Sequence, residues 1–125
     1  MILDTNTLSA LADGDPQASA AVERAETLAV PVIALGEYRF GIAQSNRARA
    51  YENWLNGFLQ SCPVISVDED TTRRYAQIRL DLKQKGASIP ANDAWIAALC
   101  LQHRAPLLSR DRHFDVVQGL RRVSW

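Results

Sequence analysis

Four acidic side chains stand where the sequence pattern ends a strand or begins a helix: Asp4, Glu37, Asp93 and Asp111. If the strands run parallel, their carboxyl ends share one edge of a sheet, and the four carboxylates meet there. Like charges brought together repel, and burial raises the cost of each. Mg²⁺ or Mn²⁺ would remove this conflict, because hard cations prefer oxygen ligands. The pattern therefore predicts a metal-dependent enzyme that acts on phosphate esters, with RNA as the expected substrate.

Each acid also has an interpretation that requires no active site. Asp4 could cap a helix, Asp93 could be an ordinary acid in a first helical turn, and Asp111 could form a turn. Glu37 favours a functional role more strongly, because it lies among apolar neighbours where an unpaired carboxylate is costly. Asp68 follows the same strand-end pattern, but we expect it to cap the helix after it and exclude it from the site.

Alternating strands and helices position these acids. Short apolar runs predict strands over residues 2–3, 30–33, 64–67, 106–109 and 123–125. Helices are expected over 5–11, 16–28, through 36–41 with an end near 45, and over 47–59, 68–85 and 90–103. Pro90 is expected at the first helical position. Such alternation implies right-handed crossovers and a parallel sheet covered on both faces. The expected fold is α/β, a three-layer α/β/α sandwich around a mostly parallel sheet of four or five strands, in one domain over residues 1–125.

Composition bounds the class of protein. A chain of 125 residues with 47% hydrophobic side chains can bury one packed core. The net charge is zero, but residues 1–37 hold six acids against Arg24 alone, whereas residues 38–125 hold eight acids against 13 bases. Cys62 and Cys100 are too few for a disulfide scaffold or a zinc site, and we expect core thiols. With no leader pattern or long apolar run, the chain is expected to be soluble and cytoplasmic, without membrane association.

Four short motifs carry a family resemblance. In chain order they are Leu3-Asp4-Thr5-Asn6, Glu37 with Gly41, Asn92-Asp93-Ala94-Trp95-Ile96-Ala97-Ala98, and Ser109-Arg110-Asp111-Arg112-His113-Phe114. The set resembles the PIN-domain ribonucleases, and within them the VapC-type toxins of bacterial toxin–antitoxin pairs, over essentially the whole chain. Position 38 is Tyr where an aliphatic residue is more usual, a departure that bears on local packing and the partner surface more than on the chemistry.

The resemblance implies roles for particular residues. The catalytic quartet would be Asp4, Glu37, Asp93 and Asp111. The ligands of Mg²⁺ or Mn²⁺ would be Asp4, Asp93 and Asp111, with Glu37 either holding a second ion or orienting the attacking water. The supporting residues would be Asn6, Asn92 and Ser109. A metal-activated water would cleave RNA in line and leave a 5′-phosphate and a 3′-hydroxyl.

The same resemblance implies macromolecular partners. RNA phosphates would be held by arginines that are close to the acids in sequence, namely Arg39, Arg110 and Arg112. A cognate antitoxin protein would bind in or beside the acidic cleft, and both a homodimer and a toxin–antitoxin hetero-oligomer are expected. His113 is expected to pack in the turn before Phe114.

Two other functions fit the residues. A non-catalytic interaction module could use this fold for partner binding, and it would show neither metal-dependent melting nor nuclease activity. A haloacid-dehalogenase-like phosphatase would use Asp4 as a nucleophile. Such enzymes usually have a second Asp two residues later, where this chain has Asn6.

Overall fold

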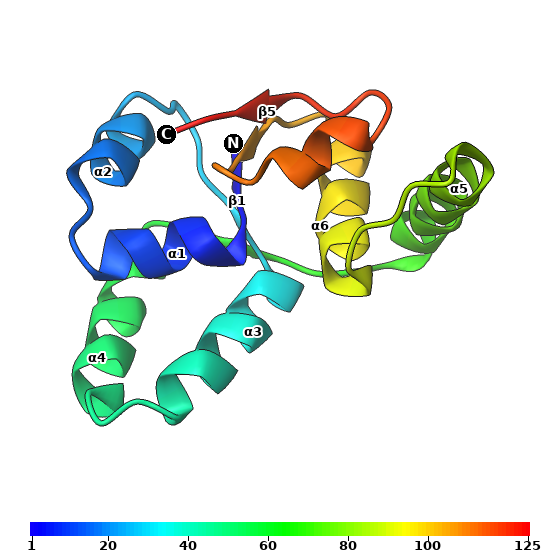
Figure 1. The fold of residues 1–125 in the computed structure, drawn as a ribbon. Coiled ribbons are helices and arrows are strands. Elements are labelled where there is room, and N and C mark those ends of the chain that lie inside the picture. Colours follow the sequence, from blue (N-terminus) through cyan, green and yellow to red (C-terminus); the bar gives the residue numbers. More distant parts are fainter.

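Five two-residue strands form the centre of the protein, whose computed structural model describes residues 1–125 (Figure 1). They are β1 (Ile2–Leu3), β2 (Val30–Pro31), β3 (Val64–Ile65), β4 (Leu107–Leu108) and β5 (Arg122–Val123). β1, β4 and β5 make a three-stranded sheet in the order β1-β4-β5, and β2 pairs with β3. Every pairing is parallel, as the alternating sequence pattern predicted.

The sheet is less continuous than the expected single sheet of four or five strands. Only one parallel bridge, between Ile2 and Ala29, joins the three-stranded and two-stranded parts. The reason is Pro31. The Ala29 amide donates to the Met1 carbonyl, and the Leu3 amide donates to the Ala29 carbonyl, so the next bond of this parallel ladder would come from the amide of residue 31. Pro31 has no N–H to donate, and the backbone turns into a helix at Val32, so the ladder between β1 and β2 stops there.

Seven helical segments surround the strands. They are α1 (Thr5–Ala12), α2 (Pro16–Glu23), α3 (Val32–Ala43), α4 (Ala48–Phe58), α5 (Glu69–Lys85), α6 (Ala91–Gln102) and the 3₁₀ helix η1 (Arg112–Val116). Local signals explain several ends. Asp68 and Thr71 form a capping box at the start of α5, and Gly86 ends α5 in the left-handed region at φ 68°. The prediction that Asp68 is a cap is confirmed.

The helices cover the strands from two sides, because neighbouring strand residues point to opposite faces. Ile2 and Leu107 belong to a core cluster shared with α5, α6, η1 and Ala34 at the start of α3. Leu3 and Leu108, the next residue of each strand, belong to a second cluster shared with α1, α2, α3 and α4. This arrangement is the predicted α/β/α sandwich. Figure 1 shows α1 to α4 gathered on one side and α5 and α6 on the other.

Some predicted element bounds were wrong. The predicted strand over 30–33 ends at Pro31, which has no N–H to continue a ladder, and α3 begins there. Glu37 consequently lies in the second turn of α3 rather than the first. Pro90 is the N-cap of α6 instead of its first helical residue, α2 stops at Glu23, and β3 stops at Ile65. None of the helices combines the length and the apolar character needed to span a bilayer.

Candidate active site

The four predicted acids line one open pocket of about 370 Å³ beyond the carboxyl ends of β1 and β4. We call it the acid pocket. Its lining residues are Asp4, Thr5, Asn6, Glu37, Pro90, Ala91, Asn92, Asp93, Asp111 and Phe114. The residues come from the start of α1, the middle of α3, the first turn of α6 and the turn after β4. The structure thus brings together side chains that are more than 100 positions apart in the sequence.

Asp4 has two structural roles at once. It is only 4% exposed, and its Oδ1 accepts a hydrogen bond from the Thr7 amide at 2.8 Å, which caps α1. Its Oδ2 accepts a hydrogen bond from the hydroxyl of Ser109 at 2.5 Å. The capping interpretation of Asp4 is therefore correct, and it does not compete with a place in the pocket.

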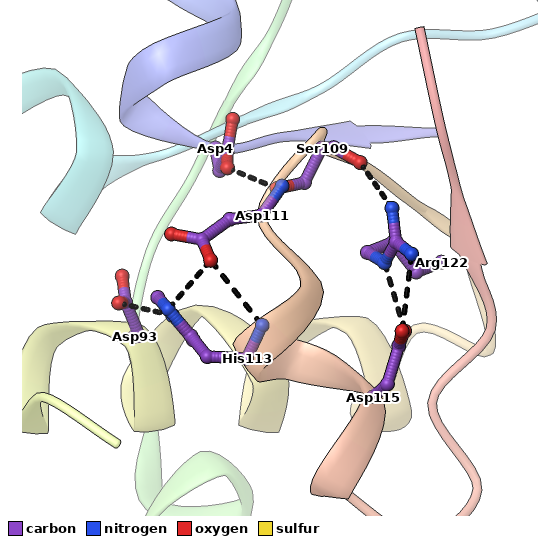
Figure 2. Close-up of polar contacts among 7 residues, drawn as sticks. All are labelled: Asp4, Asp93, Ser109, Asp111, His113, Asp115 and Arg122. Atoms are coloured by element: carbon purple, nitrogen blue, oxygen red, sulfur yellow. Dashed lines mark hydrogen bonds and ion pairs between the residues drawn. The ribbon is translucent and has the colours of Figure 1, made fainter.

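Ser109 connects Asp4 to the turn that carries Asp111 (Figure 2). Its side chain is fully buried, and its Oγ also accepts a hydrogen bond from the Asp111 amide at 3.0 Å. Arg122 donates to the Ser109 carbonyl at 3.0 Å and is itself paired with Asp115 at 2.8 and 3.0 Å. This set of bonds fixes the end of β4 behind the pocket.

His113 lies between two of the acids, as Figure 2 shows. Its Nε2 is 2.7 Å from Asp93 Oδ2, and its Nδ1 is 2.7 Å from Asp111 Oδ1. Nε2 is buried, and Asp93 is the group that it contacts. The ring also packs on Phe114 at a centroid distance of 4.6 Å, as predicted. Sequence reasoning missed the two carboxylate contacts, for which the only signal was the position of His113 two residues after Asp111.

Glu37 reaches the pocket from α3. The hydroxyl of Thr5 donates a hydrogen bond to Glu37 Oε1 at 2.9 Å, across 32 residues of sequence. The sequence predicted no role for Thr5, because nothing in the local pattern relates it to Glu37. The contact fixes one carboxylate oxygen, and Oε2 accepts no hydrogen bond from the protein.

The electrostatics of the pocket favour a cation. Burial raises the pKa of Asp93, and the carboxylates of Glu37 and Asp4 raise it further, while His113 lowers it; the net shift is upward. No lysine or arginine lines the acid pocket. The pocket therefore offers an excess of carboxylate and amide oxygens, which is the donor set that suits Mg²⁺ or Mn²⁺. A cation would also relieve the repulsion among the carboxylates.

The acids are nevertheless not arranged as a complete cage. No group of three His, Cys, Asp or Glu side chains is close enough together to hold a metal ion. His113 accounts for part of this spacing, because it occupies one oxygen of Asp93 and one of Asp111. A bound cation would compete with His113 for these two carboxylates.

The supporting and RNA-binding candidates fall into two groups. Asn6 and Asn92 line the acid pocket, and Ser109 lies beneath it. The candidate arginines do not line it. Arg39 forms an ion pair with Glu52, and the Arg110 guanidinium lies 4.0 Å from the centre of the Trp125 ring. Arg112, at the start of η1, is exposed.

Comparison with known proteins decides the family. The PIN domain matches residues 1–120, almost the whole chain. The chain belongs to the PIN-domain family. One relative is "VapC ribonuclease Y4jK" of Sinorhizobium fredii, which is 30% identical over 89% of this chain and 86% of the relative. Another is "Ribonuclease VapC5" of Mycobacterium tuberculosis, which is 28% identical over 94% of this chain and 87% of the relative.

Solved structures agree with this assignment. A chain in the crystal structure of VapBC2 from Rickettsia felis, bound to a DNA fragment from its promoter, matches with a TM-score of 0.91 and 26% identity, covering 99% of this chain and 97% of that one. A chain of FitAcB from Neisseria gonorrhoeae matches with a TM-score of 0.78 and 26% identity, covering 98% and 96%. The predicted family resemblance is confirmed.

Proposed function

We propose that this PIN domain is a metal-dependent endoribonuclease and the toxin of a toxin–antitoxin pair. One observation carries the enzymatic part: Asp4, Glu37, Asp93 and Asp111 line one pocket, where burial, and to a smaller extent the carboxylates of Glu37 and Asp4, raise the pKa of Asp93. The names of the relatives, VapC ribonucleases, supply the reaction class. Because the chain belongs to the PIN-domain family, we no longer propose the haloacid-dehalogenase-like alternative.

The residues of the acid pocket have different proposed roles. Asp4, Asp93 and Asp111 would hold Mg²⁺ or Mn²⁺, with Glu37 as a further ligand or as the group that orients water. The bound cation would supply an acidified water as nucleophile and would offset charge on the phosphate. Ser109 holds Asp4 through the 2.5 Å hydrogen bond, and Thr5 holds Glu37. Fixed carboxylates lose little entropy when they engage a ligand, so these two hydroxyls pre-organise the site.

The RNA would enter beside the turn after β4. Of the three candidate arginines, Arg112 is the one with neither an ion pair nor a ring contact, and Asp111 precedes it directly. We therefore assign Arg112 as the first phosphate contact. Arg112→Gln should raise KM for RNA, flatten its salt dependence and leave kcat unchanged. Arg73→Gln, a loss of an exposed arginine on α5, is the matched control.

An RNA cleavage assay with and without EDTA tests the reaction. Asp93→Asn keeps the shape of the side chain and removes its charge, and cleavage should fall by at least about 100-fold. Asp70→Asn makes the same change at another first-turn acid, which is exposed in α5, and should cleave like the parent. Cleavage by Asp93→Asn at the parental rate would reject the assignment, and activity that survives EDTA would point to a metal-free contaminant.

Metal binding can be measured without RNA. Mg²⁺ or Mn²⁺ should raise the Tm of the parent and of Asp70→Asn but not of Asp93→Asn. The lack of a complete cage is the one observation that favours the non-catalytic module. That alternative gains support if no metal shifts the parental Tm and no RNA is cut.

The partner proposal rests on the solved relatives. The structure from Rickettsia felis is a VapBC complex, and we propose that this chain likewise binds a cognate antitoxin, as a homodimer within a hetero-oligomer. Expression of the chain alone in a bacterial host should arrest growth, and Asp93→Asn should not. Co-expression of the antitoxin should restore growth and yield one complex in size-exclusion chromatography. Arrest that persists alongside a stable complex would contradict the proposal.

A further inference from the structure

A second polar cavity lies away from the acid pocket and shares no lining residue with it. It has a volume of about 190 Å³ between α1, α3 and α4, which Figure 1 shows grouped together. We call it the tyrosine cavity. Its lining residues are Ser9, Asp13, Tyr38, Gly41, Ile42, Ser45 and Tyr51.

The Tyr38 side chain leaves a polar group unused in this cavity. Tyr38 is only 4% exposed, and its hydroxyl is buried without a hydrogen-bond partner. The ring is held in place by edge-on packing against Trp54 at a centroid distance of 6.2 Å. A buried hydroxyl without a partner costs free energy, so native structures usually satisfy it with a protein group, an ordered water or a ligand.

Two of the groups that line the cavity with Tyr38 have free acceptor capacity. Tyr51 donates its only hydroxyl proton to Asp13 Oδ1 at 2.7 Å and then offers lone pairs alone. Asp13 Oδ2 accepts no hydrogen bond from the protein. Burial raises the pKa of Tyr38 to about 12, and the charges of Asp13, Tyr51 and Glu52 add to this shift. The cavity therefore presents negative charge and unfilled acceptors to any occupant.

The nearest cation of the chain does not fill the cavity. The guanidinium of Arg47 lies 5.1 Å from the centre of the Tyr51 ring, on its face, and forms no ion pair with Asp13. This contact also shows that the aromatic wall accepts a guanidinium by stacking.

We propose that the tyrosine cavity binds the guanidinium group of an arginine side chain presented by a partner protein. A guanidinium is planar, positively charged and rich in donors, so it can pair with Asp13 while it bonds to the Tyr38 and Tyr51 hydroxyls. The volume is far above the roughly 10–15 Å³ that one water molecule needs on the same measure, which leaves room for this larger group. The site does not depend on the nuclease proposal.

The test titrates the full, isotope-labelled chain with N-acetyl-arginine amide and follows backbone amide shifts by NMR. The matched probe is N-acetyl-citrulline amide, which has nearly the same shape and no charge. Amides of the tyrosine cavity should shift with the arginine compound and not with the citrulline compound. Equal responses to both, or no response to either, would overturn the proposal. Tighter binding of free arginine than of the blocked derivative would overturn the assignment to a protein-borne side chain.

Three variants locate the binding. Asp13→Asn should weaken the binding of the arginine compound about 10- to 100-fold, because it removes a charged hydrogen-bond acceptor. Tyr38→Phe should weaken this binding about 3- to 10-fold, because it removes a neutral one. Tyr75→Phe, which alters a stacked tyrosine on α5, should bind like the parent. Tyr38→Phe should melt no lower than the parent, because it removes an unpaired hydroxyl. A lower Tm together with unchanged arginine binding would show that an ordered water satisfies Tyr38, and it would refute the site.

A further measurement tests whether Arg47 itself occupies the cavity. If Arg47 swings into the cavity in solution, Arg47→Gln would shift the cavity amides of the free protein and tighten the binding of the arginine compound. That result would contradict the assignment to a partner protein.

Another measurement tests whether the tyrosine cavity is independent of the acid pocket. Tyr38→Phe should cleave RNA at the parental rate, because Tyr38 does not line the acid pocket. Loss of cleavage in that variant would contradict the independence of the two sites.

Discussion

Replacing Ser109 with alanine removes one hydroxyl that makes two hydrogen bonds at the floor of the acid pocket. Oγ donates to Asp4 Oδ2 at 2.5 Å and accepts from the Asp111 amide at 3.0 Å. Ser109 is fully buried and Asp4 is only 4% exposed, so water is a poor replacement for the bond to the carboxylate. The Asp111 amide is only partly buried and can be solvated more readily.

The size of the effect follows from these contacts. A hydrogen bond to a charged group contributes about 1.5–3 kcal/mol, and the second bond adds less because water replaces part of it, for a total of about 2–3 kcal/mol. A chain of 125 residues has an unfolding entropy of about 0.26 kcal/mol/K. The Tm of Ser109→Ala should therefore fall by about 8–12 °C. Because Asp4 also loses its orienting partner, the affinity for Mg²⁺ or Mn²⁺ should fall about 10- to 100-fold.

Thermal unfolding followed by circular dichroism in EDTA measures the first effect, and metal-dependent Tm shifts measure the second. Ser109→Thr keeps the hydroxyl and should recover most of the metal affinity. Ser124→Ala, an exposed serine near the carboxyl end, should match the parent in both assays. A Tm for Ser109→Ala within about 2 °C of the parent would refute the argument, because a buried charged hydrogen bond cannot be lost at so little cost.

Three other perturbations have outcomes that follow from the structure. Since the folded protein raises the pKa of Asp93 above its ordinary value of 3.8, the folded state keeps a proton that the unfolded chain has released. The contribution of Asp93 to stability should thus decline as pH rises from about 4 through the folded pKa, and urea unfolding of Asp93→Asn should lack this decline. His113→Ala should lower the free energy of unfolding in EDTA by roughly 1 kcal/mol and should enlarge the Tm rise on adding Mg²⁺, because the cation no longer competes with the imidazole for Asp93 and Asp111; a smaller rise would mean that His113 assists the cation. Gly86→Ala should cost about 1 kcal/mol by differential scanning calorimetry, because φ is 68° there although no atom lies within 4 Å of the added methyl; an unchanged Tm would mean that the helix end relaxes.

The alternation of strands and helices was readable from sequence because its signals are local. An apolar run, an Asp cap or a glycine after the last turn depends on residues within a few positions of one another. Asp68 and Gly86 bound α5 as these rules require. Parallel strands also dictate that residues at their carboxyl ends share an edge, which explains why Asp4 and Asp111 could be placed together before any coordinates.

Contacts between distant segments were decided only by the tertiary structure. Ser109 and Asp4 are 105 positions apart, and the placement of His113 between Asp93 and Asp111 depends on how η1 packs beside α6. No local propensity encodes such distances, because they result from the packing of whole elements around two core clusters. The order of the amino acids established which residues are acidic and at which edge of the sheet they gather. The folded packing determined how far apart they stand, which hydroxyls hold them, and that a histidine lies between two of them.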